Sequence, residues 1–313
     1  MRNATTSSAM GTNPIQTPDS KVLFSRGFAL LIDSIMIAIL IWWATRAFGT
    51  AQLVPQLGNN TSIPGILVDA GGTGYSVGNL MGGSTNWVVK LPLLASGMMV
   101  FLYFVLQEAF FGATLGKAMM GLRVIYQSAD GTYKNLTPIA AIIRNLVRFL
   151  DALPSAYILG WIVSLISSKR RRLGDMAAHT LVVSRESVPY LTRPRKQMKQ
   201  GFLVIAALLF VFIITCLVFM YFGRPALFIQ NGITTSTLFP KKQIISYTLG
   251  EKSWGKEDQG RQTLDYSLHF VAFDLTSMPK KKKQSCQGLV TLTWHWSTLE
   301  WDENGANDTC TDL

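Results

Sequence analysis

The longest stretch of the chain that is both apolar and uncharged is the feature that most limits how it can fold. Residues 202–222 are 21 consecutive side chains without a single charge. A helix of about 20 apolar residues crosses the hydrocarbon core of a bilayer, because each residue adds ~1.5 Å along the axis. We therefore expect a membrane-spanning helix here and an integral membrane protein around it.

Two further apolar stretches, 27–48 and 87–111, are also long enough to span a bilayer. The first begins too late and is too long for a cleaved signal peptide, and it contains Asp33. Charged residues make up only 15% of the chain, against about 25% in soluble domains. These features together predict three spans.

The distribution of charge predicts how the chain is oriented. Residues 1–223 contain 19 Lys/Arg and 8 Asp/Glu, whereas residues 224–313 contain 10 of each. Short cytoplasmic segments beside membrane spans have an excess of Lys and Arg, and residues 168–200 contain nine of them. We expect a multi-pass protein of the bacterial inner membrane, with a cytoplasmic N-terminus and an extracytoplasmic C-terminal domain.

Residues 139–167 pose the main question of topology. They are largely apolar but include Arg144, Arg148 and Asp151, and Pro154 interrupts them. As a single span they would place the following basic segment outside the cell. We favour two short helices that enter and return, hinged near Pro154, because irregular elements are tolerated at membrane depth when they pack against protein. A single span is the alternative.

The C-terminal part of the chain has the alternation of β-strands. Val290, Leu292, Trp294 and Trp296 occupy one face of an extended segment, and residues 264–270 alternate in the same way. The expected fold is an α-helical membrane bundle of three spans plus a two-helix hairpin, followed by a small β-rich extracytoplasmic domain. Its parts are a flexible cytoplasmic tail (1–20), a membrane domain with the hairpin (21–200), a transmembrane helix (201–223) and the β-rich domain (224–313).

Two other segments give weaker predictions. Residues 49–86 are rich in glycine and contain no Lys or Arg, so we expect a loose loop on the non-cytoplasmic side. Cys286 and Cys310 flank one segment of the C-terminal domain. They are candidates for a disulfide if that domain faces an oxidising compartment.

Ionisable side chains in the apolar segments are the candidate functional residues. Each costs ~2.5–3.5 kcal/mol on insertion scales, so such groups usually face protein or water and have a partner. The spacing of Arg26 and Asp33 puts both on one helix face, and Arg144, Arg148 and Asp151 share another. Asp33 and these arginines are natural partners of opposite charge across helices. Their role is either an ion or proton path or a set of buried salt bridges. The candidate cluster comprises Arg26, Asp33, Glu108, Arg144, Arg148, Asp151 and Asp175.

No motif of an enzyme, a cofactor site, a metal site or a nucleic-acid-binding domain accompanies these residues. Gly112, Gly116 and Lys117 approach a phosphate-binding loop, but the spacing is one residue short and Ala118 stands where Ser or Thr is required. We interpret the two glycines as positions where backbones approach closely. We expect a protein that is not an enzyme and holds no cofactor, metal or nucleic acid.

Four motifs in order resemble those of the RDD family of bacterial membrane proteins. They are Arg26 to Asp33, Gly116 to Val124, Arg144 to Asp151, and Arg172 to Thr180, and the resemblance extends over about residues 25–184. It implies a membrane location and an arginine and two aspartates of importance, the second aspartate being Asp175 or Asp151. It also implies transport, since cation/proton exchange is suggested for some members.

Two functions remain open at this point. The first is a transporter or exchanger that uses the Arg/Asp cluster; its small bundle would favour self-association. The second is an envelope protein whose bundle, anchored in the lipid bilayer, displays residues 224–313 to an envelope partner protein.

Overall fold

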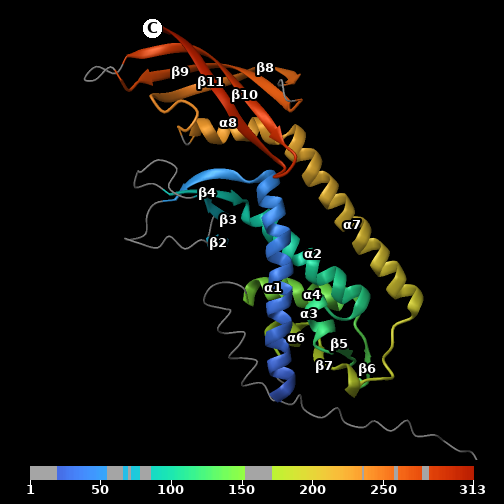
Figure 1. The fold of residues 1–313 in the computed structure, drawn as a ribbon. Helices are drawn as coiled ribbons and strands as arrows, with labels where there is room; N and C mark the ends of the chain where they lie inside the picture. Colours follow the sequence, from blue (N-terminus) through green and yellow to red (C-terminus); the bar gives the residue numbers. More distant parts are fainter. Residues whose placement is uncertain are drawn as a thin grey trace, which may run out of the picture. The chain divides into compact units, whose positions relative to one another are not determined.

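The computed structural model describes residues 20–54, 66–69, 72–77, 86–151, 171–234, 236–256, 260–276 and 282–313 (Figure 1). Three helices in these residues are long and apolar enough to cross a membrane: α1 (Ser20–Phe48), α2 (Leu93–Phe111) and α7 (Arg195–Phe222). A β-rich region follows α7. The expected three spans and C-terminal β-structure are thereby confirmed.

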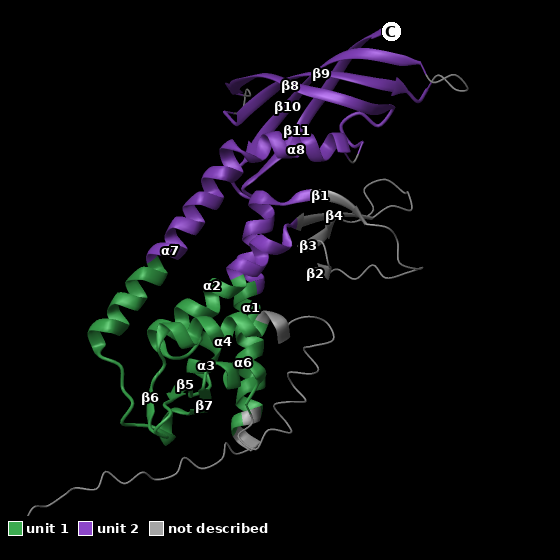
Figure 2. Cartoon of the chain, turned by 180° about the vertical axis from the view of Figure 1, so that it is seen from behind, with its two compact units in different colours: residues 1–37, 100–206 green, residues 38–99, 207–313 purple. Residues whose placement is uncertain are grey.

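The chain divides into two compact units (Figure 2). The first comprises residues 1–37 and 100–206, and the second comprises residues 38–99 and 207–313. Each of the three long helices therefore contributes one part to each unit.

The first unit combines helices with a small sheet. Its sheet has the order β6-β5-β7 and is antiparallel throughout. The sequence pair Asp130-Gly131 predicts the β5–β6 turn, where Gly131 has a φ of 79°. The elements are α3 (Leu115–Met119), β5 (Leu122–Gln127), β6 (Tyr133–Asn135), α4 (Pro138–Asp151), α6 (Leu173–Ala177), β7 (Thr180–Ser184) and the 3-10 helix η1 (Arg185–Ser187).

Helix α4 has its polar side chains inside and its apolar side chains outside. Arg144 and Asn145 are buried, whereas Ile139 is 70% exposed and Leu146 is 59% exposed. A soluble amphipathic helix has the reverse arrangement. The apolar face of α4 therefore suits contact with lipid, and its polar face supplies the interior of the unit.

The expected hairpin would begin with α4, which is described over 14 residues, Pro138–Asp151. The described residues stop at the same position, so the hairpin stays a prediction. Residues 152–170, with the hinge at Pro154 and the return leg, lie outside the described residues.

The segment between α1 and α2 differs from the loose loop that the sequence predicts. It contains four antiparallel strands in the order β1-β4-β3-β2. β4 also occupies residues 86–91, so α2 begins only at Leu93, later than the apolar stretch suggests. Pairing between strands outweighs the low strand propensity of glycine. The strands are β1 (Thr50–Val54), β2 (Ile66–Asp69), β3 (Gly72–Val77) and β4 (Asn86–Leu91).

The C-terminal part of the second unit is a four-stranded antiparallel sheet of order β11-β10-β9-β8, with α8 (Arg224–Thr234) packed against one face (Figure 1). Alternate residues of β9, including Leu264, Leu268 and Phe270, are buried in the core with Ile229 and Ile233 of α8. The alternation predicted in β9 is therefore confirmed. The strands are β8 (Lys242–Lys256), β9 (Gln262–Asp274), β10 (Lys283–His295) and β11 (Glu300–Asp312).

One residue of the predicted β10 face lies elsewhere. Val290, Leu292 and Trp294 are buried as expected, but β10 ends at His295 and Trp296 is 70% exposed. Trp296 belongs to the turn that leads to β11, because the chain must reverse there to form the antiparallel pair.

An aromatic cluster joins the end of α7 to this sheet. The ring of Tyr221 stacks with Trp254 on β8 and with Trp296, at centroid distances of 5.6 and 6.0 Å. The indole N–H of Trp301 donates to the main-chain oxygens of Met220 and Tyr221, at 3.1 and 3.2 Å. The last turn of α7 is thus part of the core of the C-terminal domain.

The two candidate cysteines lie opposite each other on β10 and β11. Cys286 and Cys310 are directly paired in the strand register, and a disulfide bond joins their sulfur atoms. Cys216, within α7, is a free and buried thiol.

Candidate functional site

Seven charged side chains of the first unit line one small buried cavity. Helices α1, α3, α4 and α6 contribute to a small cavity of about 30 Å³, room for about one water molecule. Five cationic, two anionic and three apolar side chains line it. The lining residues are Arg26, Ala29, Leu30, Asp33, Lys117, Arg144, Arg148, Arg172, Asp175 and Val182.

Two glycines allow these helices to approach closely. A Cβ atom at Gly116 of α3 would overlap the backbone of Ala29 on α1. A Cβ atom at Gly174 of α6 would lie 2.6 Å from the main-chain oxygen of Arg144 on α4. The interpretation of Gly116 as a close-approach position is confirmed, and Gly174 has the same role between α4 and α6. Gly112 differs, because a Cβ there would meet only the side chains of Arg193 and Arg123, and its φ is 71°.

Asp33 is held by uncharged donors. Its carboxylate accepts hydrogen bonds from the hydroxyl of Tyr103 at 2.9 Å, the hydroxyl of Thr114 at 2.6 Å and the main-chain N–H of Gly116 at 2.9 Å. The side chain is buried, at 1% exposure. The sequence alone predicts arginine partners for Asp33, but hydroxyl groups and a backbone amide occupy its oxygens.

Glu108, by contrast, is held by cations. The carboxylate is fully buried and forms ion pairs with Lys117 and, at 3.5 Å, with Arg144. The amide of Asn145 donates to it at 2.9 Å. A buried carboxylate is tolerated when its neighbours supply both opposite charge and hydrogen bonds, and Glu108 has both.

Asp175 is the second acid that Arg144 binds. Arg144 Nη1 lies 3.1 Å from the Asp175 carboxylate, while Arg144 Nε contacts Glu108. Burial would raise the pKa of Asp175, but the positive charges of Arg144, Arg26 and Arg172 outweigh it and hold this pKa below its usual range. One guanidinium on α4 therefore joins an acid of α2 to an acid of α6.

Lys117 contributes an ammonium group to the cluster, and the pKa of this group is lowered. Burial lowers the pKa of Lys117 to about 8, while the negative charge of Glu108 opposes this shift. Its ammonium proton is consequently held less tightly than that of an exposed lysine.

The remaining candidate residues have distinct contacts. Arg26 donates to the main-chain oxygen of Val182 on β7 at 2.8 Å. Arg148 lies over the ring of Phe104, 3.8 Å from its centroid, a cation–π contact. The side chain of Asp151 lies outside the described residues. The structure therefore brings Asp175 into the cluster, next to Arg144.

Sequence reasoning missed several members of the site. Tyr103, Thr114 and Asn145 are neutral residues in apolar or short segments, and nothing in their spacing sets them apart. Lys117 falls within one of the family motifs, but the motif by itself gives no reason to include it in the buried cluster. Its position beside Gly116 in a mainly apolar neighbourhood was the available signal, since an isolated lysine there needs a partner.

Arg193 is a further residue whose role the sequence did not reveal. It is 5% exposed, and its guanidinium donates to the main-chain oxygens of Phe110 at 2.8 Å and Leu136 at 2.9 Å, and also to that of Ala109. Carbonyl groups at the end of a helix lack partners within the helix. Arg193 donates hydrogen bonds to such carbonyl groups at the end of α2, within one turn of Glu108.

The fold and the cluster define a class: an α-helical membrane protein with fixed charges buried between its helices. The RDD family matches residues 21–179, just over half of the chain, and the protein belongs to this family. α7 and the C-terminal sheet lie beyond the match. The comparisons with curated proteins and with solved structures found no match.

Proposed function

We propose that this RDD-family protein exchanges a small cation for protons across the bacterial inner membrane, with Asp33 as the carboxylate that binds either ion. The observation behind this proposal is the difference between Asp33 and the other two buried acids. Asp33 accepts its hydrogen bonds from neutral donors, whereas Glu108 and Asp175 form ion pairs with cations.

The chemistry of these partners favours Asp33 as the exchanging group. A hydroxyl both donates and accepts, so Tyr103 and Thr114 can turn a lone pair toward a cation. Carboxylate and hydroxyl oxygens are the ligands that hard cations prefer. Glu108 and Asp175 could bind another ion only after breaking their ion pairs with Lys117 and Arg144. We assign them, with Arg144 and Lys117, to the fixed framework.

The division of the chain supports the orientation in this proposal. The segments after α1 and after α7 belong to one compact unit, and the segment between α2 and α7 belongs to the other. This grouping agrees with three crossings and a basic cytoplasmic segment before α7. The Cys286–Cys310 disulfide agrees with an extracytoplasmic C-terminal domain. A bundle this small would form its path by self-association.

Proteoliposomes with a trapped pH dye test the proposal. A sodium or potassium gradient should drive proton movement in wild-type vesicles. Asp33→Asn should abolish this movement while the protein accumulates normally. The amide oxygen can still accept from Tyr103 and Gly116, and the amide nitrogen can donate to the Thr114 hydroxyl, but the side chain cannot take up a proton. Asp130→Asn is the matched control, since Asp130 is an exposed acid in the β5–β6 turn. Wild-type flux in Asp33→Asn vesicles would rule out the proposed role.

A second candidate function is the display of the C-terminal domain to an envelope partner protein. Its support is the aromatic cluster of Tyr221, Trp254, Trp296 and Trp301, which joins the sheet to the last turn of α7. Ion exchange does not require such a joint. Truncation after Gly223 separates the two functions: an exchanger keeps its flux, whereas a display protein loses partner binding.

A further inference from the structure

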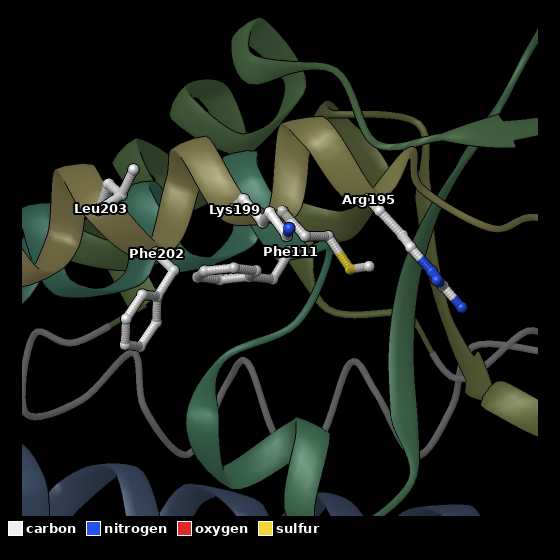
Figure 3. Close-up of a pocket in the computed structure, with 6 residues that line it drawn as sticks. Phe111, Arg195, Lys199, Phe202 and Leu203 are labelled. Carbon is white, nitrogen blue, oxygen red and sulfur yellow. The ribbon is translucent and has the colours of Figure 1, made fainter.

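An open groove lies where the end of α2 meets the first turns of α7, within the first unit (Figure 3). Its volume is about 650 Å³. Figure 3 shows the ring of Phe111 beside the α7 side chains that line the groove. Apolar groups form nearly all of the wall, including carbon atoms of Arg195 and Lys199. In Figure 3, Lys199 lies beside Phe111, and the charged end of Arg195 extends away from that ring. The lining residues are Phe111, Arg195, Met198, Lys199, Phe202 and Leu203.

We infer that this groove binds an anionic phospholipid. Its phosphate would lie against Arg195 and Lys199, and the start of one acyl chain would lie against Phe111 and Phe202. This site is separate from the buried cluster and does not depend on the proposed exchange activity.

The charged and the apolar residues of the proposed site lie on one face of α7. The five lining residues of α7 are at positions i, i+3, i+4, i+7 and i+8 from Arg195, which share one side of a helix. Phe202 lies about 10 Å further along the axis than Arg195. A phospholipid has the same order, with charge at the headgroup and hydrocarbon one or two turns deeper.

The charge of the groove is available to a ligand. Within the described part of the chain, neither Arg195 nor Lys199 has a hydrogen-bonding or ion-pairing partner. Residues 188–200 contain four Lys/Arg and no acid. Arg193 differs from them, because it binds main-chain oxygens at the end of α2. Two free cations at the start of a span are complementary to the phosphate of an acidic headgroup.

The apolar half of the groove exposes hydrophobic side chains whose contact with water is unfavourable. Phe202 is 68% exposed and Leu203 is 66% exposed, next to the two cations. Lys and Arg beside a span extend their charged ends toward the headgroups while their methylene groups stay on apolar surface. An acyl chain with its phosphate fits both requirements at once.

Native mass spectrometry of the full-length protein in detergent tests the site. The probes are phosphatidylglycerol and, as a zwitterionic reference, phosphatidylcholine. Wild type should retain one phosphatidylglycerol in preference to phosphatidylcholine. Arg195→Gln with Lys199→Gln should weaken retention about tenfold, as expected for the loss of charge-assisted contacts. Lys196→Gln is the matched control, because Lys196 has the same charge on the same turn but does not line the groove.

A second pair of variants tests the acyl-chain half and identifies the source of the phosphate. Phe202→Ala should reduce retention, whereas Phe210→Ala should not, since Phe210 is an exposed ring of α7 outside the groove. Millimolar inorganic phosphate should fail to displace the lipid. The inference is overturned by equal retention of both lipids, by unchanged retention in the double variant, or by full displacement with inorganic phosphate. All these residues are partly or largely exposed, so the variants should fold.

Discussion

Arg144 is the residue on which the buried cluster most depends. It is 8% exposed and contacts both Glu108 and Asp175, which come from α2 and α6. Its burial is possible because the two acids offset the cost of removing a guanidinium from water. The same contacts give both acids the positive partner that they need.

Arg144→Ala should destabilise the protein by about 3–5 kcal/mol, because it leaves buried carboxylates without their shared cation. Thermal unfolding in detergent measures the change. The stability of Arg144→Lys should lie between those of the wild type and Arg144→Ala. One ammonium group cannot contact both acids as the guanidinium does. A stable Arg144→Ala variant would show that the cluster does not hold the helices together.

Lys117 should give the stability of the protein a defined pH dependence. Its folded pKa of about 8 lies below the ordinary value near 10.5. Between these values the unfolded chain binds a proton that the folded chain does not, so this group adds stability as pH rises. The gain is on the order of 3 kcal/mol over the window.

Unfolding temperatures at pH 7.5, 8.5 and 9.5 test this prediction. Lys117→Gln should remove the rise that Lys117 causes, whereas Lys134→Gln, on an exposed part of β6, should leave it in place. The same slope in all three proteins would contradict the assignment.

At the scale of elements, the two short helices α3 and α6 determine the geometry of the site. Each has a glycine where it contacts the neighbouring helix. α3 packs on α1 through Gly116, and α6 packs on α4 through Gly174. These contacts bring Asp33 within 2.9 Å of the Gly116 N–H, across 83 residues of sequence. The positions of Asp33 and Asp175 therefore depend on close backbone packing.

Gly116→Ala should lower stability by at least about 1–3 kcal/mol, the usual cost of overpacking, because its Cβ would overlap the backbone of Ala29. Gly27→Ala is the matched control in α1, where a Cβ meets nothing within 4 Å. That change should be neutral or slightly stabilising, since alanine favours helices. Membrane abundance and unfolding temperature measure both, and equal behaviour of the two variants would contradict the packing argument.

At the scale of the whole molecule, three spans give the two ends of α7 different surroundings. Its first turns hold Arg195 and Lys199, and its last turn packs Tyr221 into the C-terminal domain. The basic end favours the cytoplasm. The domain would then lie outside, where its disulfide is stable.

A reporter that is active only outside the cytoplasm tests this orientation. Fusions after Gly223 and after Leu313 should both be active. A fusion after Gln127, at the end of β5, is the control and should be silent, because β5 lies between α2 and α7. Silence at Gly223 and Leu313 in an expressed protein would place the domain in the cytoplasm and an additional crossing before α7.

The sequence by itself determined the three spans, the alternating strands of the C-terminal core and most of the buried charged residues. These are local properties: the length of an uncharged stretch, the alternation of residues 264–270, and the rarity of ions such as Asp33 in apolar segments. The family resemblance also rests on local motifs, and the match over residues 21–179 confirms it.

Only the tertiary structure decided which groups meet. The sequence favours arginine partners for Asp33, yet Tyr103, Thr114 and Gly116 occupy it while Arg144 binds Glu108 and Asp175. Likewise the pairing of β1 with β4 creates a sheet from a segment with weak strand signals. The physical reason is that such contacts join residues tens of positions apart, and their geometry depends on how close the backbones can come.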